Sequence, residues 1–223
     1  MLARLSLVLL LVAPPALALE RLFVVGEARS MKDGELRYRE YHHCTEDRSN
    51  CEVLYKDTEG ELFARKRIDY SQSMSSPSLV VEDLREGRTV RINGGGDEEL
   101  VVDAGFDNYV RQRWSELSSG ETVRFPFLVV GRDSPLTMKA SRDEEEVCAA
   151  DELCLSVTLD AWLLSMLVQP IQLVYDSERR LLQYRGVSNI RDAEGKSQDV
   201  RIDYTYPTDS LASDLGTSLP AGN

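Results

Sequence analysis

The stretch Glu35–His43, Glu-Leu-Arg-Tyr-Arg-Glu-Tyr-His-His, decides the fold class of this 223-residue chain. In an extended strand, Leu36 and Tyr38 fall on one face, and Arg37 and Arg39 fall on the other. Alternation with a period of two is typical of an antiparallel sheet that buries one face and exposes the other to water. The stretch therefore predicts a mainly β protein.

The same alternation continues along most of the chain. Val53 and Tyr55 share a face in the next segment, and inward positions over residues 62–70 are apolar except for Lys66. Further short strands are predicted at Leu79–Val81, Arg88–Ile92, Leu100–Val102, Val123–Val130, Leu136–Ala140, Leu155–Leu159, Ile171–Tyr175, Leu181–Gly186 and Val200–Tyr206. Polar turns separate neighbouring strands, which predicts an antiparallel meander rather than βαβ units.

Two segments depart from this alternation. Over 103–118, apolar side chains recur at helical spacing and predict an amphipathic helix, capped by Asp103 or Asp107 and followed by Gly120. Its apolar face is expected either to pack in the core or to line an apolar ligand site, and consists of Phe106, Tyr109, Val110, Trp114 and Leu117. A second, short helix is predicted near 160–169, before Pro170, with a buried strand as the alternative.

The first 18 residues have the order of a secretory signal peptide. Arg4 precedes the apolar run Leu5–Ala13, and Ala16–Ala18 supplies small residues at the spacing of a cleavage site. The run is too short to span a bilayer. We therefore expect cleavage after Ala18, a single β domain over 19–207 with no transmembrane segment in the mature chain, and a disordered tail over 208–223.

Four cysteines form two close pairs. Six residues separate Cys44 from Cys51, and five separate Cys148 from Cys154. Four cysteines allow three connectivities, and in an exported protein the short spacing favours the two local disulfides.

A metal site is the alternative at the first pair, because His42 and His43 precede Cys44. Adjacent residues on a strand point to opposite faces, so at most one of these histidines could join the cysteines. The spacing also fits no common zinc pattern, and no metal site is predicted.

The charge and the chemistry argue against several classes of function. The chain carries 26 Lys and Arg against 38 Asp and Glu, a formal net charge of −12, which suits neither nucleic acid nor electrostatic docking on anionic lipid. It has two histidines, and Ser134 lacks the glycines of a nucleophile elbow. No catalytic residue and no cofactor site is predicted; a hydrolase is the weakest alternative.

The layout as a whole resembles a known family. An export signal, a run of antiparallel strands, a central amphipathic helix and the alternating last strand Val200–Tyr206 resemble the half-barrel of Gram-negative periplasmic lipoprotein carriers. Val102–Val110 and Leu181–Ile190 also resemble stretches of uncharacterised exported proteobacterial proteins. The resemblance implies a strongly curved antiparallel sheet wrapped around the helix.

The same resemblance implies a function and a compartment. It points to a periplasmic, non-enzymatic protein that binds a lipid or another apolar ligand in the concave face of its sheet. The alternative is a structural or interaction module that joins an envelope protein complex through a sheet edge.

Overall fold

The computed structural model describes residues 21–95, 99–145, 148–161 and 169–207. Within these ranges one sheet contains all the strands, in the order β6-β5-β4-β3-β2-β1-β13-β12-β11-β10-β9-β8-β7. Their bounds are β1 Arg21–Ser30, β2 Leu36–Cys44, β3 Asn50–Lys56, β4 Leu62–Asp69, β5 Ser78–Asp83, β6 Arg88–Ile92, β7 Val101–Val102, β8 Val123–Leu128, β9 Leu136–Arg142, β10 Leu153–Leu159, β11 Ile171–Tyr175, β12 Leu181–Val187 and β13 Asp199–Thr205. The order does not return on itself, so the sheet is open, with β6 and β7 at its edges.

Two meanders meet at the middle of the sheet. β1 pairs with β2 on one side and with β13 on the other, both antiparallel. The predicted antiparallel mainly β fold is therefore confirmed at this level. β1 is absent from the predicted strands, because Gly26 interrupts the apolar alternation of Leu22, Val24 and Ala28.

One pair of strands corrects the prediction of a pure meander. β7 and β8 are parallel, and the chain passes between them through the helical segment. Parallel neighbours need such a crossover, because a tight turn can only reverse the chain. The chain thus contains one short strand–helix–strand unit at the sheet's edge.

The predicted helical segment is present, but it is divided into three consecutive parts. It consists of a 3-10 turn, Asp103–Gly105, then α1, Phe106–Gln112, and α2, Trp114–Ser119. Arg113 separates α1 from α2 with φ −97° and ψ 18°. Gly120 ends α2 in the left-handed conformation, at φ 93°, as its position predicts.

The predicted aspartate cap is wrong. Gly105 is the N-cap of α1, and no side chain caps either helix. A Cβ on Gly105 would lie 2.0 Å from the Ser75 carbonyl oxygen, so glycine is required where the helix starts against the β4–β5 loop. The Asp103 carboxylate pairs with Lys66 instead.

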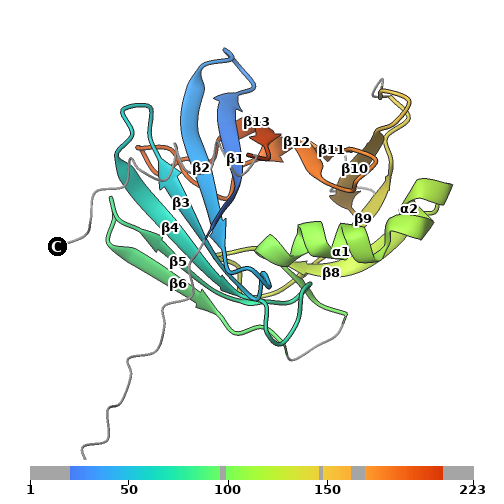
Figure 1. Cartoon of the computed structure of the whole chain (residues 1–223), viewed down its shortest axis with the longest axis horizontal. Helices are drawn as coiled ribbons and strands as arrows, with labels where there is room; N and C mark the ends of the chain where they lie inside the picture. The colour runs from blue at the N-terminus through green and yellow to red at the C-terminus, as the bar shows by residue number, and fades with distance from the viewer. Residues whose placement is uncertain (1–20, 96–98, 146–147, 162–168, 208–223) are drawn as a thin grey trace, which may run out of the picture.

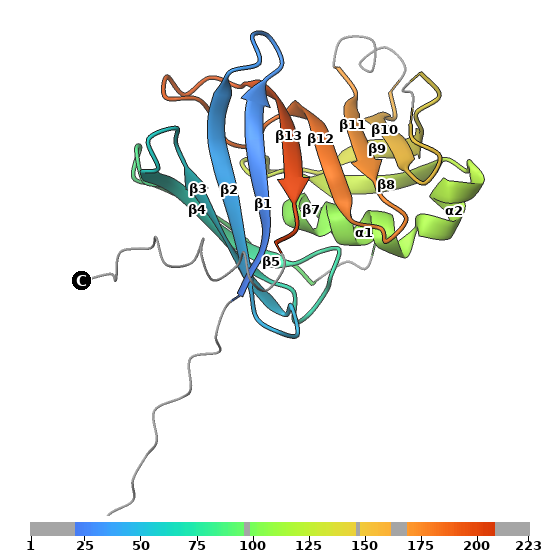
Figure 2. The same ribbon diagram turned by 45° about the horizontal axis from the view of Figure 1, so that its top comes forward.

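Buried side chains form two clusters on the face of the sheet that carries the helices, here called the inner face. The first cluster lies mainly on β1–β5 and β13, and the second joins α1 and α2 to β8–β11. Figures 1 and 2 show the sheet bending strongly, with both helices inside the bend beside β8. Tyr184 on β12 contacts both clusters.

Three sequence predictions fall outside the described residues. These are the signal peptide, the tail over 208–223 and most of the short helix near 160–169. No helix among the residues that the structure describes is long and apolar enough to span a bilayer.

Candidate functional site

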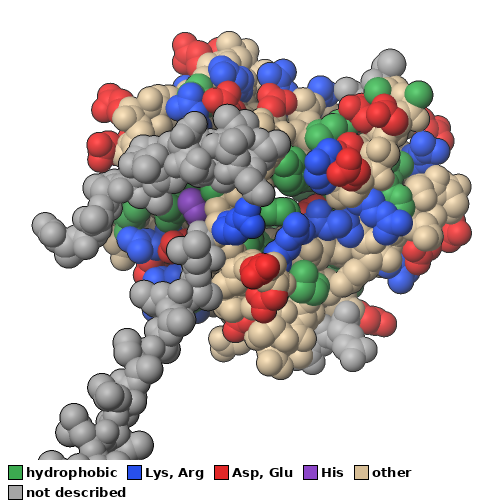
Figure 3. Space-filling view, in the orientation of Figure 1, with side chains coloured by type: hydrophobic (Ala, Val, Ile, Leu, Met, Phe, Trp, Pro, Cys, Tyr) green, Lys and Arg blue, Asp and Glu red, His purple; other side chains and the backbone are tan. Residues whose placement is uncertain are grey.

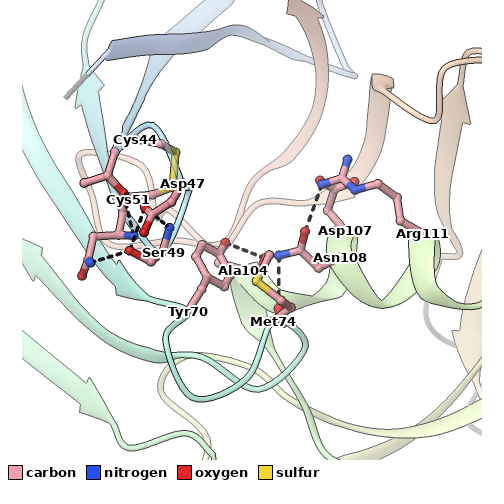
Figure 4. The surroundings of a disulfide bond; sticks show 12 residues. Cys44, Asp47, Ser49, Cys51, Tyr70, Met74, Ala104, Asp107, Asn108 and Arg111 are labelled. Atoms are coloured by element: carbon pink, nitrogen blue, oxygen red, sulfur yellow. Dashed lines mark hydrogen bonds and ion pairs between the residues drawn. A yellow bond between two sulfur atoms is a disulfide. The ribbon is translucent and has the colours of Figure 1, made fainter. Parts of the chain in front are cut away.

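Both predicted disulfides are present. Cys44 and Cys51 face each other across β2 and β3, and Cys148 joins Cys154 at the start of β10. The first bond consumes the two thiols that the alternative metal site needs. Disulfides of this kind indicate a non-reducing environment. Figure 4 shows the Cys44–Cys51 bond on one side of the inner face, with Tyr70 between it and α1.

The predicted apolar helix face packs on the second cluster. Val110 and Leu117 are completely buried. Phe106 stacks on Phe125 at 5.6 Å between ring centroids, and the half-buried Trp114 meets the buried Tyr175 edge-on at 5.8 Å. Tyr109 lies 4.8 Å from Phe125. The face therefore belongs to the core beside β8–β11.

A buried ion pair joins β4 to the helical segment. Lys66 Nζ donates to both Asp103 carboxylate oxygens, at 2.9 and 2.8 Å. The exposed Asn189 also donates its side-chain amide to Asp103, at 3.0 Å. Lys66 was the exception in the alternation, and the structure explains it, because its position faces inward toward a carboxylate.

A second polar group lies on β2, around Glu40. Its side chain is only 7 % exposed, and its Oε2 atom lies 3.0 Å from His42 Nε2. Tyr204 on β13 donates its hydroxyl to the same oxygen at 3.4 Å. His42 and Tyr204 also meet edge to face, with 6.2 Å between ring centroids.

Gly26 makes the contact between β13 and β2 possible. In the sheet it is the cross-strand partner of both Glu40 and Tyr204. A Cβ at this position would lie 2.9 Å from the Tyr204 ring and 2.9 Å from Ile202. Glycine therefore leaves the space in which Tyr204 reaches over β1 to Glu40.

Tyrosines surround Glu40 on the inner face. Burial raises the pKa of Tyr38, Tyr55, Tyr184 and Tyr204, and the nearby Glu40 carboxylate raises each pKa further. These phenols stay protonated at neutral pH and can donate hydrogen bonds; Tyr38, for example, lies 2.7 Å from the buried Ser188 hydroxyl.

The Glu40 group was not predicted from the sequence, although a signal is present there. Leu36, Tyr38, Glu40 and His42 share one face of the strand, and the first two are the apolar residues that define the inward face. A carboxylate in that phase is a buried charge, which proteins rarely keep without a partner.

The surface around the helices differs from the acidic average of the chain. In the view of Figure 3, hydrophobic and Lys or Arg side chains gather across the middle of the molecule, and acidic side chains lie mostly nearer its outline. Arg48 lies over the ring of Phe23, and Arg179 lies over Trp114.

A hollow of about 400 Å³ lies on another part of the sheet, across β3–β6. Its lining alternates between the two faces of these strands and includes Glu52, Arg67, Asp69 and Arg91. Its cations and carboxylates balance, which favours no charged ligand.

No protein-family model matches the chain, and no curated protein matches its sequence. The candidate function therefore rests on the residues of the site itself.

Proposed function

We propose that this chain is a periplasmic, non-enzymatic binding protein, and that its sheet is a half-barrel that takes a lipid or another amphipathic ligand against its inner face. The observation that carries the proposal is the group of partly exposed aromatic side chains on that face. Tyr70, Tyr184 and Tyr204 lie at the first cluster, and the helix residues Phe106, Tyr109 and Trp114 lie at the second. Apolar surface beside polar groups suits an amphipathic ligand.

Export to the periplasm is part of the same proposal. The order of charged, apolar and small residues over 1–18 supports a cleaved signal peptide, and the two disulfides support an oxidising compartment. Mass spectrometry of the exported protein should show loss of the first 18 residues. An intact Met1 would contradict this part of the proposal.

The test of ligand binding is native mass spectrometry of protein purified from the periplasm without detergent. We expect a discrete added mass from a retained amphiphile. A fluorescence titration with 11-dansylaminoundecanoic acid measures binding directly. Protein that carries no added mass and leaves the dansyl fluorescence unchanged would overturn the proposal.

Two neighbouring valines on β5 provide a matched pair of variants. Val81 faces inward opposite Lys66, and Val80 faces outward opposite Arg67. Val81→Trp should fill space at the inner face and weaken dansyl-fatty-acid binding, whereas Val80→Trp should leave it unchanged. Thermal melts of both variants show that each remains folded.

The sheet edge favours one alternative function. β6 ends the sheet, so its outer backbone groups are placed to pair with an added strand. A module that joins an envelope complex would use this edge. Val90→Pro would remove an edge N–H or disturb the pairing of β6 with β5. If the alternative holds, a partner that crosslinks to the wild-type protein in cells should no longer crosslink to this variant.

A further inference from the structure

Within the described part of the chain, no Lys or Arg forms a salt bridge with the buried carboxylate of Glu40. Among the salt bridges of the described residues, its one partner is His42, whose side chain is 26 % exposed. The other buried acid of the inner face, Asp103, is neutralised by Lys66 and also accepts from Asn189. A buried charge without a strong counter-ion is costly, and it is retained where a ligand or a proton compensates it.

Aromatic rings occupy the positions around this carboxylate. Tyr55 is its direct cross-strand neighbour on β3, and Tyr204 reaches it over Gly26. Tyr38 meets Tyr55 edge to face at 6.1 Å. With Tyr184, whose pKa also responds to Glu40, these residues form what we call the Glu40 cluster: Glu40, His42, Tyr38, Tyr55, Tyr184 and Tyr204.

Apart from His42, the members of the Glu40 cluster attract positive charge or tolerate it. A carboxylate and the faces of aromatic rings, which carry partial negative charge, both attract cations. The phenols do not ionise at neutral pH, and they can complete the hydrogen bonds of a bound donor. Aromatic cages are an arrangement that proteins use to recognise quaternary ammonium groups.

We propose that the Glu40 cluster binds the ammonium group of a cationic or zwitterionic amphiphile, as a primary amine or a quaternary ammonium. This inference rests on the proposed function, because the apolar part of the molecule lies along the inner face. The bound ammonium replaces the His42 contact as the counter-ion of Glu40. The Lys66–Asp103 pair, already neutral, positions the helical segment beside it.

The test is isothermal titration calorimetry of the purified protein with three ten-carbon amphiphiles below their critical micelle concentrations. The probes are decyltrimethylammonium bromide, sodium decyl sulfate and decyl maltoside. An ion pair with aromatic support is worth about 1.4 kcal/mol or more, so the cationic probe should bind at least about tenfold more tightly than the anionic one.

Two substitutions assign that preference to the cluster. Glu40→Gln should weaken decyltrimethylammonium binding about tenfold and leave decyl maltoside binding unchanged. Glu27→Gln on the neighbouring strand removes a carboxylate that is bound to Arg39 instead, and should leave both affinities unchanged. If Glu40→Gln does not fold, Tyr204→Leu removes an aromatic face and Tyr204→Phe keeps it; only the leucine variant should lose the preference.

The outcomes separate the two proposals. If none of the three amphiphiles binds, the proposed function itself fails. If all three bind equally, or if Glu40→Gln or Tyr204→Leu keeps the full cation preference, the ammonium site is wrong and the amphiphile-binding function stands. Tetramethylammonium chloride should compete with the cationic probe and weaken the binding of that probe alone. Sodium chloride is the control for ionic strength.

Discussion

Lys66 and Asp103 are joined by two hydrogen bonds of 2.9 and 2.8 Å although 37 positions separate them in sequence, and their side chains are only 4 and 6 % exposed. The pair ties the middle of β4 to the point where the chain leaves the sheet for α1. Asp103 has φ 32°, a conformation uncommon for a residue with a side chain. The ion pair and Asn189 hold the chain in that conformation.

Breaking this pair should be strongly destabilising. Lys66→Met leaves the buried Asp103 charge uncompensated, which typically costs about 3–5 kcal/mol of the free energy of unfolding. Urea denaturation measures the loss. The double variant Lys66→Met with Asp103→Asn should recover part of it, because no unpaired charge remains. Lys139→Met on β9, where no such pair exists among the described contacts, serves as the control. If Lys66→Met lowers the free energy of unfolding by less than about 1 kcal/mol, the pair does not have this role.

Gly26 should not tolerate a side chain. An alanine Cβ would lie 2.9 Å from Ile202 and Tyr204, and such overpacking typically costs about 1–3 kcal/mol. Gly26→Ala should therefore lower the urea midpoint. It should also weaken decyltrimethylammonium binding, because Tyr204 must move away from Glu40. The double variant Gly26→Ala with Tyr204→Ala should recover only part of the lost stability, because the new Cβ still clashes with Ile202. If Gly26→Ala leaves the urea midpoint unchanged, the strands adjust to the side chain and this prediction is wrong.

The general fold follows from local patterns, whereas the site depends on contacts between distant segments. Alternation on β2 and β13 and helical spacing over 106–117 are properties of neighbouring residues, so they can be found in sequence. The short cysteine spacings similarly indicated both disulfides. The parallel β7–β8 pair has no local pattern, because β7 has only two residues.

The contacts of the site could not be predicted for the same reason. Glu40 and Tyr204 are 164 positions apart, and Lys66 and Asp103 meet only when β4 faces the helical segment. The sequence marked Lys66 as an exception, but it did not indicate a partner. The predicted N-cap role of Asp103 was wrong because its carboxylate binds Lys66, and this tertiary interaction is stronger than a local capping hydrogen bond.

The helix should contribute to stability through its buried face. Leu117 is completely buried and contacts the second cluster, so Leu117→Ala should cost about 2–5 kcal/mol. Ser118→Ala changes an exposed neighbour on the same helix and should have an effect of less than about 0.5 kcal/mol. Thermal or urea unfolding distinguishes the two, and equal effects would mean that α2 does not pack on the sheet in solution.

Each disulfide should make a modest contribution to the free energy of unfolding. Both close short loops, with sequence separations of seven and six, which corresponds to about 2–3 kcal/mol on the chain-entropy model. Replacing either pair by serines should lower stability by that amount and leave the protein folded, because the core is large. Peptide mapping without reductant should link Cys44 to Cys51 and Cys148 to Cys154; a crossed link would contradict the structure.

Acidification should destabilise the protein through His43, next to the Glu40 cluster on β2. Burial lowers the pKa of His43 from its ordinary value of 6.5, and His42 and Lys56 lower it further. The unfolded chain therefore binds a proton at this residue more readily than the native chain, so stability falls as the pH drops through 6.5 toward the lower native pKa. His43→Gln should reduce the loss of stability between about pH 7.5 and pH 5.5, measured as the shift of the urea midpoint; this window lies above the range in which carboxylates titrate. An unchanged pH dependence in His43→Gln would show that His43 is as accessible to protons in the native protein as in the unfolded chain.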